Sequence, residues 1–197
     1  MCIRDSNAVV FKASEICPRT HGLIVEALDE GGLPAGLVSL VTNAPEDAGE
    51  IVGALVDHPA IRRINFTGST KVGRIIAERA ARQLKPVLLE LGGKAPFLVL
   101  RDADLDEAVK AAIFGAFFNQ GQICMSTERI ILAPEIADDF VARFTARAAA
   151  LKAGDPRDGK APLGAVVDAH TVEKVTALIE DALSLIHISE PTRQEAI

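Results

Sequence analysis

The feature that most constrains the fold is a regular alternation of short apolar runs and amphipathic stretches in the first half of the chain. The apolar runs that we predict to be strands are 8–11, 37–42, 61–68 and 86–91. Helical spacing of apolar residues predicts the intervening helices at 18–29, 46–56 and 70–84. Short links between such elements require parallel pairing with right-handed crossovers, so we expect an α/β fold with an open parallel sheet and flanking helices.

The alternation restarts after Gly93, which indicates a second α/β unit. Its predicted strands are 95–100 and 128–133, and its predicted helices are 102–118, 136–151 and 169–183. We therefore place a domain boundary at Gly92–Gly93, with one partial domain over 7–92 and another over 93–183.

Both terminal stretches break this pattern. MCIRDS at 1–6 and SLIHISEPTRQEAI at 184–197 lack periodicity and capping signals. They resemble translated sequencing-adapter text, so we interpret them as assembly artefacts and exclude them from the fold. Genuine disordered termini are the alternative.

Composition and cysteine usage exclude several classes of protein. A net charge of −6 gives little electrostatic support to a nucleic-acid partner. No apolar run approaches the roughly 18 residues needed to span a bilayer, and no secretory leader precedes the first strand. Cys2, Cys17 and Cys124 form neither a disulfide framework nor a metal-binding spacing. We expect a cytoplasmic protein without a metal, a membrane or a nucleic-acid partner.

Cys124 lies in FFNQGQICMSTER, on the connection between a predicted helix and a predicted strand. Connections beside strand ends often display reactive groups, and their backbone N–H groups can stabilise an oxyanion. A free cysteine is also commonly an inert, buried residue. Its own neighbourhood leaves both interpretations of Cys124 open.

The stretch FTGSTKVG joins a predicted strand to a predicted helix. Gly68 would let the backbone approach a phosphate, and Ser69 and the helix N-terminus could donate hydrogen bonds to it. The full GxGxxG signature is absent, because Thr70 replaces the middle glycine. An ordinary strand–turn–helix is the alternative.

Charged residues lie at or near the carboxyl ends of two predicted strands. Lys12 and Glu15 follow the first strand, where they could bind ribose hydroxyls or simply form a solvated helix start. Glu90 lies in the apolar run VLLELGG. It is either a buried carboxylate of the kind that acts as a general base, or a side chain that reaches solvent at the strand end.

FKASE, FTGSTKVG, LELGGKAP and NQGQIC together resemble the aldehyde dehydrogenase superfamily, in matching order and separation over 7–183. The sequence around NQGQICMSTERI is most similar to the benzaldehyde, vanillin and salicylaldehyde dehydrogenase branch. The resemblance implies that 7–92 is the C-terminal part of a Rossmann-like NAD-binding domain. It implies that 93–183 is the N-terminal part of the catalytic domain.

The same resemblance implies oxidation of an aldehyde, expected to be aromatic, to a carboxylic acid. Cys124 would form a thiohemiacetal and then a thioester, its backbone N–H would help to bind the oxyanion, and Glu90 would act as general base. NAD is the expected cofactor, with NADP possible. The residues implied to bind it are Lys12, Glu15, Gly68, Ser69, Gly73, Leu91 and Gly92.

Members of this superfamily are typically more than twice as long, so the resemblance implies an internal fragment of a homodimeric or homotetrameric parent. We expect the fragment alone to be inactive. Two alternatives remain: a catalytically inactive nucleotide-binding fragment, and a misassembled reading frame without independent function.

Overall fold

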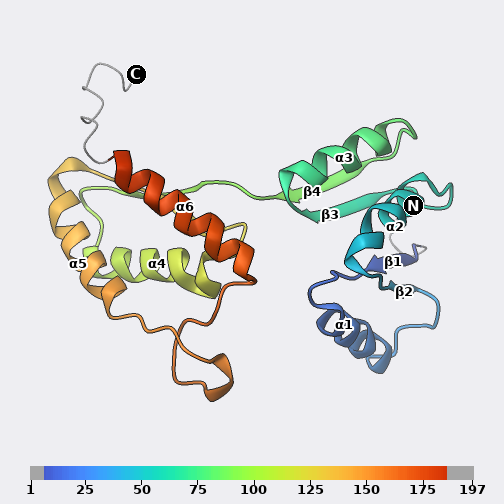
Figure 1. Ribbon diagram of the computed structural model, residues 1–197, viewed down its shortest axis with the longest axis horizontal. Helices are drawn as coiled ribbons and strands as arrows, with labels where there is room; N and C mark the ends of the chain where they lie inside the picture. The colour runs from blue at the N-terminus through green and yellow to red at the C-terminus, as the bar shows by residue number, and fades with distance from the viewer. Residues whose placement is uncertain (1–6, 186–197) are drawn as a thin grey trace. The chain divides into compact units, whose positions relative to one another are not determined.

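The structure is a computed structural model that describes residues 7–185 (Figure 1). Its contacts divide the chain into two units, one ending at Leu91 and the other beginning at Gly92. The predicted terminal artefacts lie almost entirely outside the described residues. The exceptions are Ser184 and Leu185, which continue the last helix.

Strands and helices alternate throughout the described part of the first unit, as the sequence pattern predicts (Figure 1). Its strands are β1 (Val9–Lys12), β2 (Val38–Val41), β3 (Ile64–Gly68) and β4 (Val87–Leu91). Its helices are α1 (Pro18–Glu30), α2 (Ala48–Asp57) and α3 (Thr70–Ala81), with a 3-10 turn, η2 (Pro45–Asp47), before α2. α3 ends before its predicted end at residue 84, where Leu84 adopts a left-handed φ of 51°.

Every strand pair in the first unit is parallel, which confirms the predicted α/β class. β1 pairs with β2 and β3 pairs with β4, so the described strands form two pairs and not one continuous sheet. The register places Thr67 opposite Glu90 and Gly68 opposite Leu91. Parallel pairing brings the carboxyl ends of both strands in a pair to the same edge.

The core of the first unit lies between α2, α3 and the β3–β4 pair. Val56, Ile76 and Ala80 are its buried residues, surrounded by partly buried apolar side chains from both strands. Arg79 on α3 also holds Asp57 on α2 through two hydrogen bonds of 2.9 and 2.6 Å. By donating these hydrogen bonds to the ionised Asp57 carboxylate, the Arg79 guanidinium lowers the pKa of that carboxyl.

The second unit is built on one parallel pair, β5 (Ala95–Val99) with β6 (Thr127–Leu132). Its helices are α4 (Leu105–Phe117), α5 (Ala137–Ala149) and α6 (Ala169–Leu185). Its 3-10 turns are η3 (Phe118–Gly121), η4 (Pro134–Ile136) and η5 (Pro156–Asp158). The buried core consists of Val99, Val109, Ala112 and Phe140.

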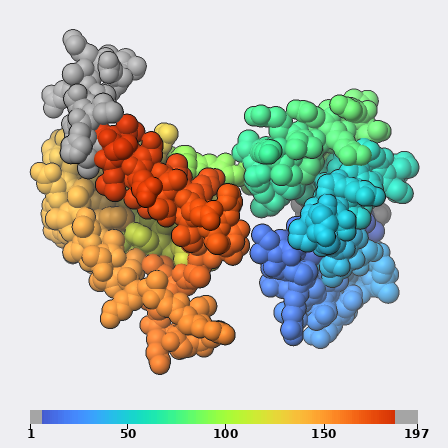
Figure 2. Space-filling model, in the orientation of Figure 1, coloured from blue at the N-terminus to red at the C-terminus, as the bar shows by residue number. Residues whose placement is uncertain are grey.

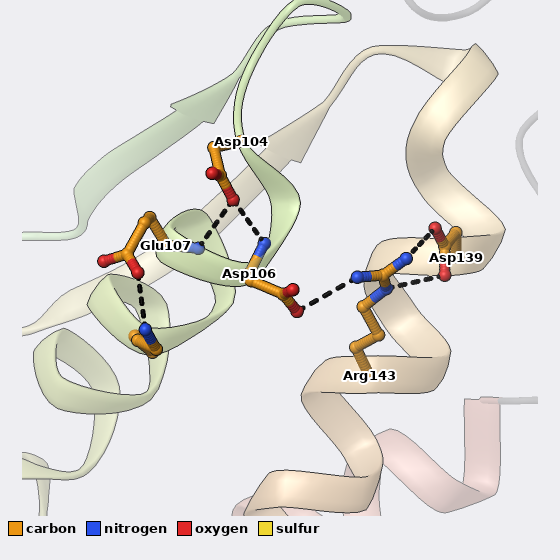
Figure 3. A network of polar contacts seen from close by, with 6 residues as sticks. Asp104, Asp106, Glu107, Asp139 and Arg143 are labelled. Carbon is orange, nitrogen blue, oxygen red and sulfur yellow. Dashed lines mark hydrogen bonds and ion pairs between the residues drawn. The ribbon is translucent and has the colours of Figure 1, made fainter.

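A polar network fixes α4 against α5 at the edge of this core (Figure 3). Asp104 caps α4 by accepting hydrogen bonds from the N–H groups of Asp106 and Glu107 at 3.0 and 3.1 Å. Arg143 on α5 binds Asp139 with two hydrogen bonds of 2.8 Å and reaches Asp106 on α4 at 3.0 Å. One guanidinium therefore joins the first turns of both helices.

α6 lies on the surface of the second unit and has no buried residue among those described (Figure 2). Its exposed apolar side chains are Val172, Val175, Leu178, Ile179, Leu183 and Leu185. α1 in the first unit likewise exposes Leu23, Ile24 and Leu28. Apolar faces of this extent normally contact another surface, so both helices lack part of their packing in the described chain.

Phe140→Ala should destabilise the second unit, because Phe140 is only 1% exposed at the centre of its core. Large-to-small substitution of a buried phenylalanine typically costs about 3–5 kcal/mol. Phe114→Ala on α4 is the matched control, since Phe114 is 65% exposed. Urea denaturation followed by circular dichroism should show a large loss for Phe140→Ala only, and equal losses would contradict the assigned core.

Candidate functional site

The carboxyl end of the β1–β2 pair carries a compact polar cluster. Lys12, the last residue of β1, forms an ion pair with Glu15, and both side chains are about one-fifth exposed, at 19% and 21%. Asn43, just beyond β2, donates from Nδ2 to Glu15 Oε1 at 3.2 Å. Hydrogen bonding to Lys12 is the main reason why the pKa of Glu15 falls from 4.5 to about 2. Glu15 is therefore ionised at every physiological pH.

Asn43 is a member of this cluster that the sequence analysis missed. Its Nδ2 also donates to the carbonyl oxygen of Ala44 at 2.7 Å, while its buried Oδ1 has no hydrogen-bond partner among the described residues. The signal was present in the sequence, because a polar residue directly after the second of two parallel strands lies at the same edge as Lys12.

The turn between β3 and α3 presents the N-terminus of a helix. Gly68 ends β3, and Ser69 is the N-cap of α3, accepting from the N–H of Val72 at 3.3 Å. The Ser69 hydroxyl hydrogen remains available as a donor beside the unpaired N–H groups of the first helical turn. Such a helix start favours an anionic group.

Gly73 allows α3 to lie directly on β4. It is buried, and a Cβ atom at this position would come within 2.7 Å of the Leu91 side chain. A larger residue would therefore push α3 away from the strand. This close packing also fixes where the α3 N-terminus lies relative to β4.

Glu90 is exposed, so the structure shows the second of the two alternatives that the sequence left open. β4 alternates between a packed face, with Val87, Leu89 and Leu91, and an open face, with Leu88 and Glu90. An apolar run alone does not reveal this alternation, because Leu88 is apolar yet also exposed. Leu91 ends the strand and is half-buried, and Gly92 beyond it is exposed.

Cys124 lies on a tight turn in the second unit, between η3 and β6. The N–H of Ser126 donates to the carbonyl of Ile123 at 3.0 Å, which closes a four-residue turn with Cys124 at its second position. Cys124 is an exposed free thiol. Within residues 7–185 its backbone N–H donates to no acceptor.

The predicted site residues are divided between the two units. Those of the first unit are Lys12, Glu15, Gly68, Ser69, Gly73, Glu90 and Leu91, and those of the second are Gly92 and Cys124. In the described part of the chain no group of acidic, histidine or cysteine side chains is arranged to hold a metal ion. No described helix is both long and apolar enough to cross a bilayer.

Polar groups at the carboxyl ends of parallel strands define this chain as an α/β protein of the ligand-binding, open-sheet class. The model of the aldehyde dehydrogenase family matches residues 2–186. The chain belongs to the aldehyde dehydrogenase family, as the resemblance of its four motifs predicts.

Comparison with individual proteins confirms the predicted branch. A vanillin dehydrogenase of Pseudomonas fluorescens is 57% identical over 184 residues, which cover 93% of this chain and 38% of the relative. A salicylaldehyde dehydrogenase structure from Pseudomonas putida G7, complexed with salicylaldehyde, has a TM-score of 0.85 and 50% identity over 90% of this chain and 37% of that one.

A second similar structure contains a cofactor. The crystal structure of PnpE in complex with nicotinamide adenine dinucleotide has a TM-score of 0.83 and 39% identity, covering 91% of this chain and 36% of that one. The present chain therefore spans well under half the length of the relatives that it matches.

Lys12→Met should raise the pKa of Glu15 from about 2 towards its ordinary value of 4.5. Because the folded-state pKa is depressed, the stabilisation is fully present above pH 4.5 and is lost as the pH falls towards 2. Its upper limit at neutral pH is on the order of 3 kcal/mol, less for these partly exposed groups.

Carbon-13 detected NMR titration of the Glu15 carboxyl measures this shift directly. Lys110→Met is the matched control, since Lys110 pairs with Glu107 on an exposed face of α4. An unchanged Glu15 titration in Lys12→Met would show that the ion pair does not control this carboxylate.

Proposed function

We propose that this chain is the central part of an NAD-dependent aldehyde dehydrogenase that oxidises an aromatic aldehyde to a carboxylic acid. The observation that carries the proposal is the exposed Cys124 thiol on a turn whose own backbone N–H is unpaired among the described residues. Family membership and the vanillin and salicylaldehyde dehydrogenase relatives support the reaction and the substrate class.

In the proposed reaction Cys124 Sγ, as a thiolate, forms a bond to the aldehyde carbon. The carbonyl oxygen becomes an oxyanion, to which the Cys124 N–H would donate a hydrogen bond. A nicotinamide cofactor, when bound, would supply the hydride acceptor for the hemiacetal carbon, and Cys124 would then hold the acyl group as a thioester. Covalent capture therefore separates the oxidation from the hydrolysis.

The second half of the proposed reaction releases the acid. Glu90 accepts a proton from water, the resulting hydroxide adds to the thioester carbon, and the C–S bond breaks to return the Cys124 thiolate. Support for this role comes from family membership and from the place of Glu90 in the LELGGKAP motif, because the exposed side chain is not the buried carboxylate that the sequence pattern allowed for a general base.

All the proposed cofactor contacts except Gly92 come from the first unit. The Lys12–Glu15–Asn43 cluster would bind the adenosine ribose, and Gly68 and Ser69 at the start of α3 would bind the pyrophosphate. Gly73 would allow this close packing, and Leu91 and Gly92 would line the nicotinamide pocket. The ionised Glu15 would repel a 2′-phosphate, which favours NAD over NADP.

We also propose that the parent enzyme is a cytoplasmic homodimer or homotetramer. The location is supported by the free thiols of Cys17 and Cys124, which suit a reducing compartment. The exposed apolar faces of α1 and α6 support further protein contacts in the parent.

A second candidate function is nucleotide binding without catalysis. It is favoured by the fact that the ribose-binding and phosphate-binding groups all belong to the first unit, whereas the thiol belongs to the second. Titration of the 197-residue chain with NAD, followed by iodoacetamide labelling and peptide mass spectrometry, separates the two candidates. Binding with an unreactive Cys124 would favour the second.

The catalytic proposal is tested by placing residues 7–183 of this chain into the homologous region of the Pseudomonas putida salicylaldehyde dehydrogenase, which is 53% identical to it. The chimera should form NADH with salicylaldehyde or vanillin. Cys124→Ser should lower kcat by at least about 10³-fold, as is usual for loss of a covalent nucleophile. Glu90→Gln should slow thioester hydrolysis, visible as a burst of NADH followed by a slow phase.

Cys17→Ser is the control for the chimera, because Cys17 lies beside α1 in the first unit and has no catalytic assignment. Full turnover by the Cys124→Ser chimera would show that Cys124 is not the nucleophile. Sustained turnover without a slow phase in Glu90→Gln would refute the general base.

Glu15→Gln in the same chimera should narrow the preference for NAD over NADP by about tenfold, because a neutral amide no longer repels the 2′-phosphate. The measurement is the ratio of kcat/KM values for the two cofactors. Glu107→Gln on α4 is the charge-matched control and should leave the ratio unchanged. An equal ratio in Glu15→Gln and the unsubstituted chimera would contradict the role of this carboxylate.

A further inference from the structure

The backbone directly before the Cys124 turn is left-handed over three successive residues. Asn119, Gln120 and Gly121 have φ values of 50°, 58° and 73°. Glycine adopts this conformation freely and asparagine tolerates it, but for a residue such as Gln120 it costs roughly 1–2 kcal/mol. A strained turn of this kind persists only where surrounding contacts hold it.

Gln122 supplies side-chain contacts to this turn, beside the backbone hydrogen bond that its N–H donates to the carbonyl oxygen of Asn119 at 3.1 Å. Its Oε1 accepts a hydrogen bond from the backbone N–H of Val167 at 2.9 Å. Its Nε2 donates to the carbonyl oxygen of Asn119 at 3.1 Å. The Gln122 amide therefore joins Asn119, the first left-handed residue, to Val167, which lies 45 positions beyond Gln122.

The segment that Gln122 contacts is itself anchored. Gly164 N lies 2.8 Å from Oε1 of Gln120 in the amide orientation that satisfies both groups. Leu163 forms a bridge with Ala153, and its carbonyl accepts from the N–H of Gly154 at 2.9 Å. Residues 163–167 thus connect the end of the α5 region to the turn that precedes Cys124.

The turn also has little freedom to move towards α4. A Cβ atom at Gly121 would come within 3.0 Å of the Ala116 carbonyl oxygen, so the chain passes close to the last turn of that helix. The left-handed segment before Cys124 therefore contacts α4 on one side and residues 163–167 on the other.

We propose that Gln122 is a positioning residue for Cys124, acting through its hydrogen bonds to Val167 N and Asn119 O. The proposal rests on the proposed function only in treating Cys124 as the nucleophile. Without the Gln122 amide the left-handed turn can relax to an ordinary backbone conformation. The Cys124 thiol and its backbone N–H would then no longer keep one fixed arrangement.

The test uses the 197-residue chain and the rate of Cys124 alkylation by iodoacetamide, read by peptide mass spectrometry. Gln122→Met keeps the length of the side chain but forms neither hydrogen bond. Val167→Pro removes the N–H from the other end of the same contact, and Val167→Ala keeps it. Gln83→Met, on an exposed glutamine after α3, is the matched control for the first substitution.

Gln122→Met and Val167→Pro should each slow Cys124 alkylation at neutral pH at least threefold, about 0.65 kcal/mol by the relation of rate to activation free energy. Cys17 in the same molecule should react at an unchanged rate. The double variant should be no slower than either single one, because both remove one contact.

Equal Cys124 alkylation rates in Gln122→Met and the unsubstituted chain would overturn the proposal. So would a Val167→Ala variant as slow as Val167→Pro, or a Cys17 rate that changes together with that of Cys124, since either points to general loss of structure. The proposed function is tested separately: turnover by the Cys124→Ser chimera would contradict the role of Cys124 as nucleophile, whatever the alkylation rates show for Gln122.

Discussion

Parallel pairing is the constraint on which the rest of the first unit depends. Two parallel strands end at the same edge, so residues that follow β1 and β2 meet although they lie far apart in the sequence. Glu15 and Asn43 meet in this way, 28 positions apart, and Lys12 completes their cluster. The β3–β4 pair has the same effect on the Gly68 turn and on Glu90 to Gly92. The direction of the strands therefore decides which polar groups of this unit lie together.

The second unit displays its thiol by a different physical means. Cys124 is not at the end of a buried strand; it lies on a turn whose entry is left-handed and whose geometry is held by the Gln122 amide. Backbone strain in one segment is offset by hydrogen bonds from another. A segment far along the chain, residues 163–167, thereby becomes part of the support for the nucleophile proposed here.

The hydrophobic periods of strands and helices and the order of the motifs predict those features that depend on neighbouring residues. The alternation of elements, the parallel class and the family were predictable, because strand and helix periods and capping signals are properties of neighbouring residues. Glu90 shows the limit of that approach. Its apolar neighbours allowed either burial or exposure, and the side of β4 on which it lies depends on which face α3 covers. Asn43 and Gln122 were not identified, since their roles come from partners 28 and 45 positions away.

The sequence by itself determined the order of the elements, the membership of the aldehyde dehydrogenase family and the identity of the groups able to do chemistry, because each is recorded in short local patterns. Tertiary structure alone decided which of those groups are exposed, which are held and by what. It placed Glu90 on an open strand face, left the Cys124 N–H without a partner among the described residues, and joined Lys12, Glu15 and Asn43 into one cluster. Exposure and hydrogen-bond partners depend on segments brought together by folding, and no local pattern contains that information.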